Sequence, residues 1–246
     1  MKDQVHGYGE VRAAVYDEDS LSNKGNREEH RFYLEAILRY FDSKRVSRFI
    51  ELGCGTGYYT DLFYDVYPEI QGVILDGSEE MLRLAVEKME KIGNFPAAIC
   101  RLFEDFEPAL DCPGEYDIAF SCLAIHHLPD ESKGDMFRKI GSCLRAGGIF
   151  VLYDLFKCGS AQSDRLLEYL SCKDIQRKLK AELDIGIEIE DLSIDNIIRS
   201  DRDARRREGD QEATLEMQIA ALRDAGFCSV TIFYQEARFF GLVAVK

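Results

Sequence analysis

Hydrophobic and polar positions follow two different periods along this chain, and the changes of period predict its secondary structure. Short apolar runs, rich in β-branched and aromatic residues, have the length of buried strands. Such runs occur at Val46–Leu52, Ile70–Leu75, Ala97–Leu102, Tyr116–Ser121 and Ile149–Tyr153. Between them, apolar side chains recur at helical spacing and predict helices over residues 27–42, 58–67, 78–92 and 130–144. Strands that alternate with helices indicate a parallel, doubly wound sheet.

Residues 159–209 break this alternation. The segment is highly charged, its apolar side chains recur at helical spacing, and no part of it has the pattern of a strand. We therefore predict a helical insertion, which covers the active site as a lid, packs against the flank of the sheet, or does both. The pattern then predicts a helix over Thr214–Ala225 that ends at Gly226. Two β-rich segments, Phe227–Tyr234 and Ala237–Val245, follow and predict an antiparallel hairpin.

The predicted fold is α/β: a Rossmann-like, doubly wound, mostly parallel seven-stranded sheet with a terminal antiparallel hairpin and a helical insertion. We divide the chain into four parts. Residues 1–45 form an N-terminal flap and helix, and residues 46–158 form the ligand-binding core. Residues 159–209 form the insertion, and residues 210–246 supply the last helix and the hairpin that completes the sheet.

The length and the charge of the chain limit the number of domains and the classes of partner that we expect. The 246 residues suit one α/β domain with insertions. Lysine plus arginine number 31 and aspartate plus glutamate 45, so the formal net charge is −14. A field of that sign repels phosphate backbones, which disfavours nucleic acid as a partner. The basic cluster of Arg202 with 205–207 is interrupted by acidic residues, which is typical of a solvated helix end.

Neither a membrane span nor a secretory signal is expected. No apolar run approaches the roughly 18 residues of a membrane-spanning helix, and the first residues lack the apolar core of a signal peptide. The 8 cysteines contain no Cys-x-x-Cys pair. We therefore expect reduced thiols, no metal site and a cytoplasmic location.

Three glycines at alternate positions form the most informative motif. Gly53, Gly55 and Gly57 follow the first predicted strand directly and precede an amphipathic helix. Such a turn lets a ligand lie against the backbone at a helix N-terminus, whereas a turn that only connects two elements needs a single glycine. The Gly-x-Gly-x-Gly spacing also differs from the Gly-x-Gly-x-x-Gly of dinucleotide-binding proteins, which disfavours a nicotinamide dehydrogenase.

This loop, with an acidic residue two positions before the first glycine, resembles motif I of the class I S-adenosylmethionine (SAM) methyltransferases. In that family the loop holds the methionine half of the cofactor. The resemblance therefore implies SAM as the cofactor of this chain. The residues that it implies for binding are Glu51, Gly53, Cys54, Gly55 and Gly57.

Asp76 ends the second predicted strand, nineteen residues after Gly57. That interval is close to the one at which an acidic residue meets a ribose, and a carboxylate can accept hydrogen bonds from both ribose hydroxyls. The alternative is an acid at the start of the next helix. Because Ser78 already supplies a cap there, we favour the ribose role. Gly77 and Met81 are further candidates, although Met81 suits the core equally well.

Two more candidates rest on the family resemblance. After the third strand, it implies that Asp105 accepts a hydrogen bond from the adenine amino group and that the N–H of Phe106 bonds the ring. Glu104 is an alternative at one position earlier. Near the N-terminus, Tyr16 resembles a tyrosine of bacterial and archaeal members, in which the flap closes on the cofactor.

The segment from Tyr116 to Asp130 resembles the fourth-strand motif of small-molecule SAM methyltransferases, which ends in His-His-Leu. The resemblance implies that Ser121 and Cys122 lie beside the transferred methyl group. His126 is then either a general base or substrate hydrogen-bond partner, or a residue that only braces the loop. For His127 we favour bracing.

The resemblance covers residues 46–153 and 214–246 and implies a SAM-dependent methyltransferase. The negative charge and the lid-like insertion favour a small-molecule acceptor of unidentified structure. Two alternatives stay open: a SAM-dependent enzyme that modifies a tRNA nucleoside or a cofactor precursor, and a non-catalytic SAM-binding regulatory protein. A homodimer is possible.

Overall fold

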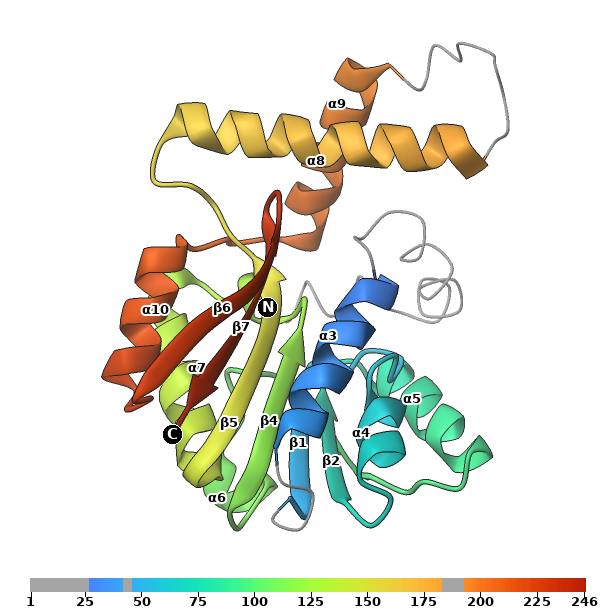
Figure 1. The fold of residues 1–246 in the computed structure, drawn as a ribbon, viewed down its shortest axis with the longest axis vertical. Helices are drawn as coiled ribbons and strands as arrows, with labels where there is room; N and C mark the ends of the chain where they lie inside the picture. The colour runs from blue at the N-terminus through green and yellow to red at the C-terminus, as the bar shows by residue number, and fades with distance from the viewer. Residues whose placement is uncertain (1–26, 42–45, 183–192) are drawn as a thin grey trace.

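A seven-stranded mixed sheet forms the centre of the protein in the computed structural model, which describes residues 27–41, 46–182 and 193–246 (Figure 1). The strand order across the sheet is β3-β2-β1-β4-β5-β7-β6. The strands are β1 (Arg48–Leu52), β2 (Gln71–Asp76), β3 (Ala97–Cys100), β4 (Tyr116–Cys122), β5 (Leu144–Leu155), β6 (Ser229–Glu236) and β7 (Phe239–Val245). Strands β1 to β5 pair in parallel, and β7 runs antiparallel to both β5 and β6.

This architecture confirms the predicted fold, including the terminal hairpin. The chain leaves β1 in one direction to build β2 and β3, and returns to the other side of β1 to build β4 and β5. The order therefore reverses between β1 and β4, where the connections diverge and leave a crevice at the carboxyl ends of the strands. That point is where a doubly wound sheet binds its ligand.

Helices cover both faces of the sheet (Figure 1). They are α3 (Arg27–Tyr40), α4 (Thr60–Val66), α5 (Glu79–Lys91), α6 (Pro108–Asp111), the 3₁₀ turn η2 (Ile125–His127), α7 (Asp130–Cys143), α8 (Ala161–Glu182), α9 (Ile194–Glu208) and α10 (Leu215–Asp224). The predicted cap of α5 is confirmed, because the Ser78 hydroxyl accepts a hydrogen bond from the Met81 N–H at 3.3 Å. Among the described residues, none of these helices is both long and apolar enough to span a bilayer.

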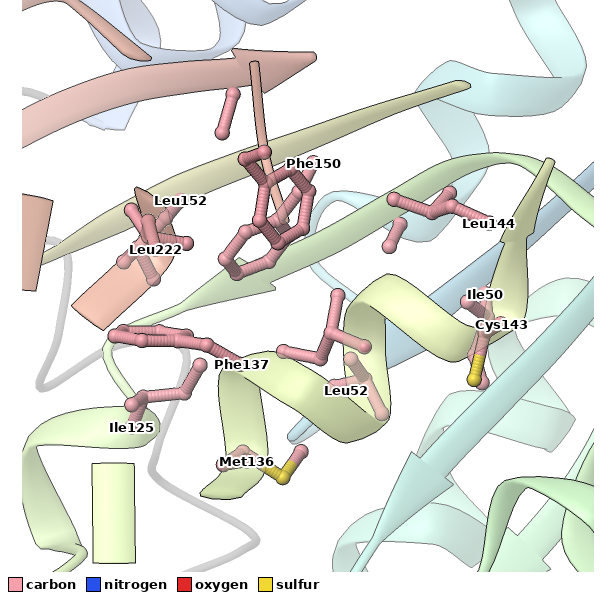
Figure 2. Close-up of a cluster of buried hydrophobic side chains, with 14 of the residues drawn as sticks. Ile50, Leu52, Ile125, Met136, Phe137, Cys143, Leu144, Phe150, Leu152 and Leu222 are labelled. Atoms are coloured by element: carbon pink, nitrogen blue, oxygen red, sulfur yellow. The ribbon is translucent and has the colours of Figure 1, made fainter. Parts of the chain in front are cut away.

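Two buried clusters hold the layers together. On one face, Phe137 of α7 and Leu222 of α10 pack with Phe150 and Leu152 of β5 (Figure 2). On the other face, Leu34 and Leu38 of α3 belong to a cluster with several aromatic rings. These rings include Phe49 and Phe63, whose centroids lie 4.3 Å apart in a stacked arrangement. Because both faces are buried, the central strands read as continuous apolar runs in the sequence.

The strand β5 begins five residues earlier than the predicted Ile149. Its first residue pairs with Tyr116, and the register then shifts before Ile118 pairs with Ile149. Gly148 lies within this irregular stretch, where a Cβ atom would come within 3.0 Å of the Arg145 carbonyl oxygen. Gly147 and Gly148 therefore lie inside a bulged strand that begins before them.

The segment after β5 is helical, as predicted. Figure 1 shows α8 and α9 beyond the end of the sheet toward which β4 points. The two helices contact each other, and Glu168 of α8 pairs with Arg202 at 2.5 Å and with Arg205 at 2.7 Å. Residues 183–192 between them lie outside the described part of the chain. Whether α8 and α9 act as a lid stays a prediction.

Candidate cofactor-binding site

A cavity opens at the carboxyl ends of the central strands, at the point where the strand order reverses. It brings together residues from the glycine loop, the end of β2, the start of α5 and the end of β4. Eight of the residues predicted from the sequence line it: Glu51, Gly53, Cys54, Gly55, Asp76, Gly77, Met81 and Cys122. A single site therefore collects most of the candidates that the motifs supplied.

The glycine loop has a conformation that other residues rarely adopt. Gly53, Gly55 and Gly57 have φ values of +72°, +53° and +73°, which lie in the left-handed region. A Cβ atom on Gly53 would approach the Cβ of Ala124 to 2.4 Å, and one on Gly57 would approach Ala85 to 3.1 Å. Gly57 does not line the cavity. Its small size instead lets the loop pack against α5.

Asp76 holds this loop in place. Its Oδ2 accepts the N–H of Gly55 at 2.8 Å, and its Oδ1 accepts the N–H of Ser78 at 2.8 Å. Burial raises the pKa of the Asp76 carboxyl, and the backbone hydrogen bonds from Ser78 and Gly55 oppose that rise. Each carboxylate oxygen has a further lone pair, so the side chain can still accept hydrogen bonds from a diol in the cavity.

Glu51 closes the cavity from the end of β1. The Thr60 hydroxyl donates to its Oε2 at 2.6 Å, and only 2% of the residue is exposed. Burial raises the pKa of Glu51 to about 8, against the hydrogen bond from Thr60. The side chain is therefore mostly protonated at neutral pH and can donate as well as accept a hydrogen bond.

The end of β4 separates two neighbouring candidates. Cys122 lines the cavity, and burial raises the pKa of its thiol to about 12, so it is not a thiolate nucleophile at neutral pH. Ser121 is fully buried, and its hydroxyl donates to the Leu52 carbonyl oxygen at 2.8 Å. It connects β4 to β1 and is not among the residues that line the cavity.

The structure does not bring Asp105 and Phe106 to the cavity. Asp105 is exposed, whereas the Phe106 ring is buried in the hydrophobic core and its N–H donates to the Phe103 carbonyl oxygen at 3.4 Å. The cavity wall here consists of Leu102 and Phe103, together with Arg101. Tyr16 lies outside the described residues.

Of the two histidines, His127 lines the cavity and His126 lies behind it. His126 is 4% exposed and does not line the cavity, whereas His127 does. The Nδ1 of His126 bonds the carboxylate of Asp154, and its Nε2 lies 3.5 Å from Asp210. Burial alone would lower the pKa of His126, but Asp154 and Asp210 raise it to about 10. His126 therefore lies behind the cavity wall, paired with two carboxylates, and its role as a general base stays a prediction.

Comparison with known proteins adds independent information. A family model described as a methyltransferase domain matches residues 49–148. An uncharacterised methyltransferase of Geobacillus is 32% identical over 151 residues, which cover 60% of this chain and 66% of that protein. A malonyl-[acyl-carrier protein] O-methyltransferase of Ilyobacter polytropus is 26% identical over 144 residues, which cover 58% of this chain and 50% of that protein. The match to the family model includes the whole glycine loop and Asp76.

Residues 49–148 therefore carry a methyltransferase domain, and the chain has the fold of the SAM-dependent methyltransferases. The fold agrees with that of magnesium protoporphyrin IX methyltransferase from Synechocystis, solved with bound SAM, at a TM-score of 0.59 and 14% identity. That match covers 100% of this chain and 98% of the other. The matched part of the methyltransferase spans only 43% to 66% of the length of its curated relatives.

Several residues that line the cavity belong to no recognised sequence motif. Arg27, at the start of α3, lines the cavity and lies 4.7 Å from the ring centroid of Tyr58, which follows the glycine loop. The helical pattern predicted α3 but not which of its residues faces the site. Leu102 and Phe103 could have been found from position alone, because they follow β3 directly at its carboxyl end.

A second segment that the sequence did not reveal lies against the histidines. Residues 210–212, between α9 and α10, form a strap across the end of β4. The Gln211 N–H donates to the His126 carbonyl oxygen at 2.8 Å, and its side-chain amide donates to the His127 carbonyl oxygen at 3.2 Å. The ammonium group of Lys133 also donates to the Gln211 carbonyl oxygen. This strap fixes the end of the insertion against the methyltransferase site.

Proposed function

We propose that this methyltransferase transfers a methyl group from SAM to a small-molecule acceptor. The observation that carries the proposal is that the glycine loop, Asp76 and His127 line one cavity at the reversal point of the sheet. The first two suit the two ends of the cofactor, and the third stands at the end of β4, on the side where an acceptor enters. The activity, the acceptor and the partners of the whole protein are part of this proposal.

The residues of the cavity suit SAM as follows. The backbone of Gly53 and Gly55 offers a surface without side chains for the methionine half. Asp76 accepts the ribose hydroxyls with its remaining lone pairs. Met81 and Phe103 provide apolar walls for the adenine, and the guanidinium of Arg27 offers a counter-charge for the cofactor carboxylate.

Bound SAM supplies a methyl group that is already activated by a positively charged sulfur. The protein then has to align the acceptor in line with that methyl group and exclude water. Cys122, at the end of β4, and His127, in the 3₁₀ turn that follows, line the part of the cavity to which we assign this reaction. We assign Cys122 to packing, because its thiol stays protonated, and His127 to contact with the acceptor.

A small acceptor is favoured over tRNA because three arginines of the cluster in the insertion already pair with carboxylates. Arg202 and Arg205 both pair with Glu168, and Arg206 pairs with Asp203 at 3.1 Å. Arginines that bind phosphate need free donors. With a net charge of −14, the molecule offers little attraction to a nucleic acid. We also propose that α8 and α9 cover the acceptor side.

The first prediction tests the cofactor. Calorimetry with S-adenosylhomocysteine should show binding to the wild-type protein and at least about 100-fold weaker binding to Asp76→Ala, because the variant loses both the ribose contact and the bonds that shape the loop. The control Asp135→Ala removes a carboxylate whose side chain is 56% exposed on α7 and should bind normally. Binding of NADH without binding of S-adenosylhomocysteine would refute the proposal.

Turnover separates an enzyme from a SAM-binding regulatory protein. A panel of small acceptors from different metabolite classes should include at least one that releases S-adenosylhomocysteine faster than the protein does alone. If the protein binds the cofactor but no panel member stimulates release, the regulatory alternative gains support.

A further inference from the structure

Three side chains beside the cavity form a compact set of nitrogen and oxygen atoms. Asp210 Oδ1 lies 3.5 Å from His126 Nε2 and 3.5 Å from His127 Nδ1. One ligand atom from each residue lies within 4.8 Å of the other two. We propose that His126, His127 and Asp210 bind one divalent transition-metal ion. This differs from the expectation of no metal site, which rested on the absence of cysteine pairs.

The spacing suits such an ion. Histidine nitrogens and carboxylate oxygens bind zinc-like ions at about 2.0–2.2 Å, so two ligands of a tetrahedral site lie about 3.3–3.5 Å apart. The two distances to Asp210 already have this length. The nitrogen atoms of the two imidazoles are the remaining pair, and the His127 side chain, which is 17% exposed, has room to adjust.

Asp154 gives this set a supporting carboxylate. It bonds the Nδ1 of His126, which directs the Nε2 atom of the same ring toward Asp210. Asp154 is itself only 1% exposed and accepts the N–H of Leu155 at 2.9 Å. Histidines that bind metals usually donate their other ring nitrogen to a carboxylate in this manner, which fixes the tautomer and the ring orientation.

The backbone also brings the ligands together before any ion binds. Gln211, the neighbour of Asp210, bonds the carbonyl oxygens of both histidines. The ammonium group of Lys133 bonds both Leu128 and Gln211 and therefore joins the two segments. A preformed ligand set lowers the entropic cost of binding.

The charge of the surroundings favours a cation at this position. Asp154 is buried, the side chain of Asp210 is 5% exposed, and both carboxylates lie against His126. Glu212 lies close by, but Arg238 and Arg205 pair with it and offset its charge. A divalent ion bound between the two histidines and Asp210 would offset the charge of both aspartates.

The position of His127 indicates a functional role for the ion. Because His127 also lines the cavity, an ion that it binds would lie at the cavity wall. Three protein ligands leave at least one coordination position open. We infer that this position takes an oxygen or nitrogen atom of the acceptor and orients it toward the methyl group. This second inference rests on the proposed function, whereas the metal site does not.

Cobalt(II) is the probe that tests the site. The full-length protein, treated with a chelator and dialysed, is titrated with Co²⁺ while its visible absorption is recorded. We expect one equivalent of Co²⁺ to bind and to show the absorption spectrum of an ion with nitrogen and oxygen ligands. Thiolate ligands, which are softer, would instead add a charge-transfer band. Asp210→Asn and His127→Gln should each weaken binding at least about tenfold.

The matched control is Asp203→Asn. Asp203 is a carboxylate of α9 whose side chain is 53% exposed, and this variant should bind Co²⁺ as the wild type does. Circular dichroism of each variant checks that it is folded. A folded wild-type protein that binds no Co²⁺, or binds it with a thiolate charge-transfer band, would overturn the metal site. Equal affinity in folded wild type and Asp210→Asn would overturn it as well.

S-adenosylhomocysteine separates this inference from the proposed function. If it binds by calorimetry and shifts the cobalt spectrum, the ion lies beside the cofactor, as we infer. If it binds and leaves the spectrum unchanged, the role in orienting the acceptor is wrong. If Co²⁺ binds but S-adenosylhomocysteine does not, the proposed function fails and the metal site stands.

Discussion

The two sides of the cavity are built in different ways. On the side of β1 and β2, the glycine loop and Asp76 form the wall, and their positions depend on backbone conformation and on hydrogen bonds to backbone N–H groups. On the side of β4 and β5, charged side chains from three separate segments pair with one another behind the cavity wall. His126, Asp154 and Asp210 meet there although 84 residues separate the first from the last. One side is therefore specified locally and the other by long-range pairing.

The strap of residues 210–212 joins the helical insertion to the second of these two sides, because Gln211 bonds the carbonyl oxygens of both histidines.

The largest effect is expected when the backbone-built side is disturbed. Gly53→Ala adds a Cβ atom 2.4 Å from that of Ala124 at a φ of +72°. We expect the unfolding free energy to fall by about 2–5 kcal/mol and the affinity for S-adenosylhomocysteine to fall at least about tenfold. Chemical denaturation and calorimetry measure the two quantities.

Gly93→Ala is the matched control for that variant. Gly93 has a similar φ of +80°, but a Cβ atom there would meet nothing within 4 Å. Gly93→Ala should lower the unfolding free energy only by the strain of the left-handed conformation, about 1–2 kcal/mol, and should leave the cofactor affinity unchanged. Equal loss of affinity in the two glycine variants would show that general destabilisation, not the loop, controls binding.

A smaller and more selective effect is expected on the side built from side chains. Lys133→Met removes a buried ammonium group that joins Leu128 to Gln211. We expect a loss of about 2–3 kcal/mol in unfolding free energy, because two carbonyl oxygens lose a charged donor. Hydrogen exchange should become faster in residues 193–212, and affinity for S-adenosylhomocysteine should stay close to wild type.

Lys139→Met provides the comparison within the same helix. Lys139 lies 3.6 Å and 3.8 Å from its acidic partners at the surface, so its loss should change stability by less than about 1 kcal/mol. If Lys133→Met weakens cofactor binding as strongly as Gly53→Ala, the two sides of the cavity are not independent.

The smallest effect concerns His30, which contacts both sides. It stacks on Phe239 at 4.1 Å and on Tyr153 at 5.3 Å, and its Nδ1 lies 3.4 Å from the Tyr59 hydroxyl. Burial, together with the charges of Arg27 and Lys178, lowers the pKa of His30 from 6.5 to about 3. The folded state therefore excludes a proton that the unfolded state binds below pH 6.5.

The neutral state of His30 predicts a pH dependence of stability. Because its folded pKa is depressed, its contribution is complete above pH 6.5 and is lost as the pH falls toward about 3. Between pH 7 and pH 5, the wild type should lose about 2 kcal/mol more unfolding free energy than His30→Phe. Denaturation of both proteins at the two pH values measures this difference. Parallel pH profiles would show that His30 is accessible to protons.

Sequence reasoning reached the fold because each strand is a continuous apolar run between clear turns. It placed the start of β5 five residues too late, because Gly147 and Gly148 interrupt the apolar run within the bulge, and it missed α6, which has only four residues. It reached Gly53 and Gly55 through one contiguous motif after the first strand, and Asp76 through its position at the end of the second strand. Local sequence therefore carries most of the cofactor side.

Other site residues depended on orientation, which the motif does not encode. Neighbouring residues of a strand point to opposite faces, so Cys122 lines the cavity while Ser121 bonds β1. In the 3₁₀ turn Ile125–His127, successive side chains differ by about 120°, which separates the roles of His126 and His127. Asp210 was invisible because its partners are distant in the sequence.

The place of β7 has a consequence for how the molecule is made. It is the last of the seven strands along the chain, yet it lies in the interior of the sheet between β5 and β6. During synthesis, β6 emerges before the strand that connects it to the rest, and β5 keeps an open edge until Phe239–Val245 arrive. A nascent chain that pauses before this point therefore exposes the edge of β5 and the adjoining apolar core to pairing with other chains.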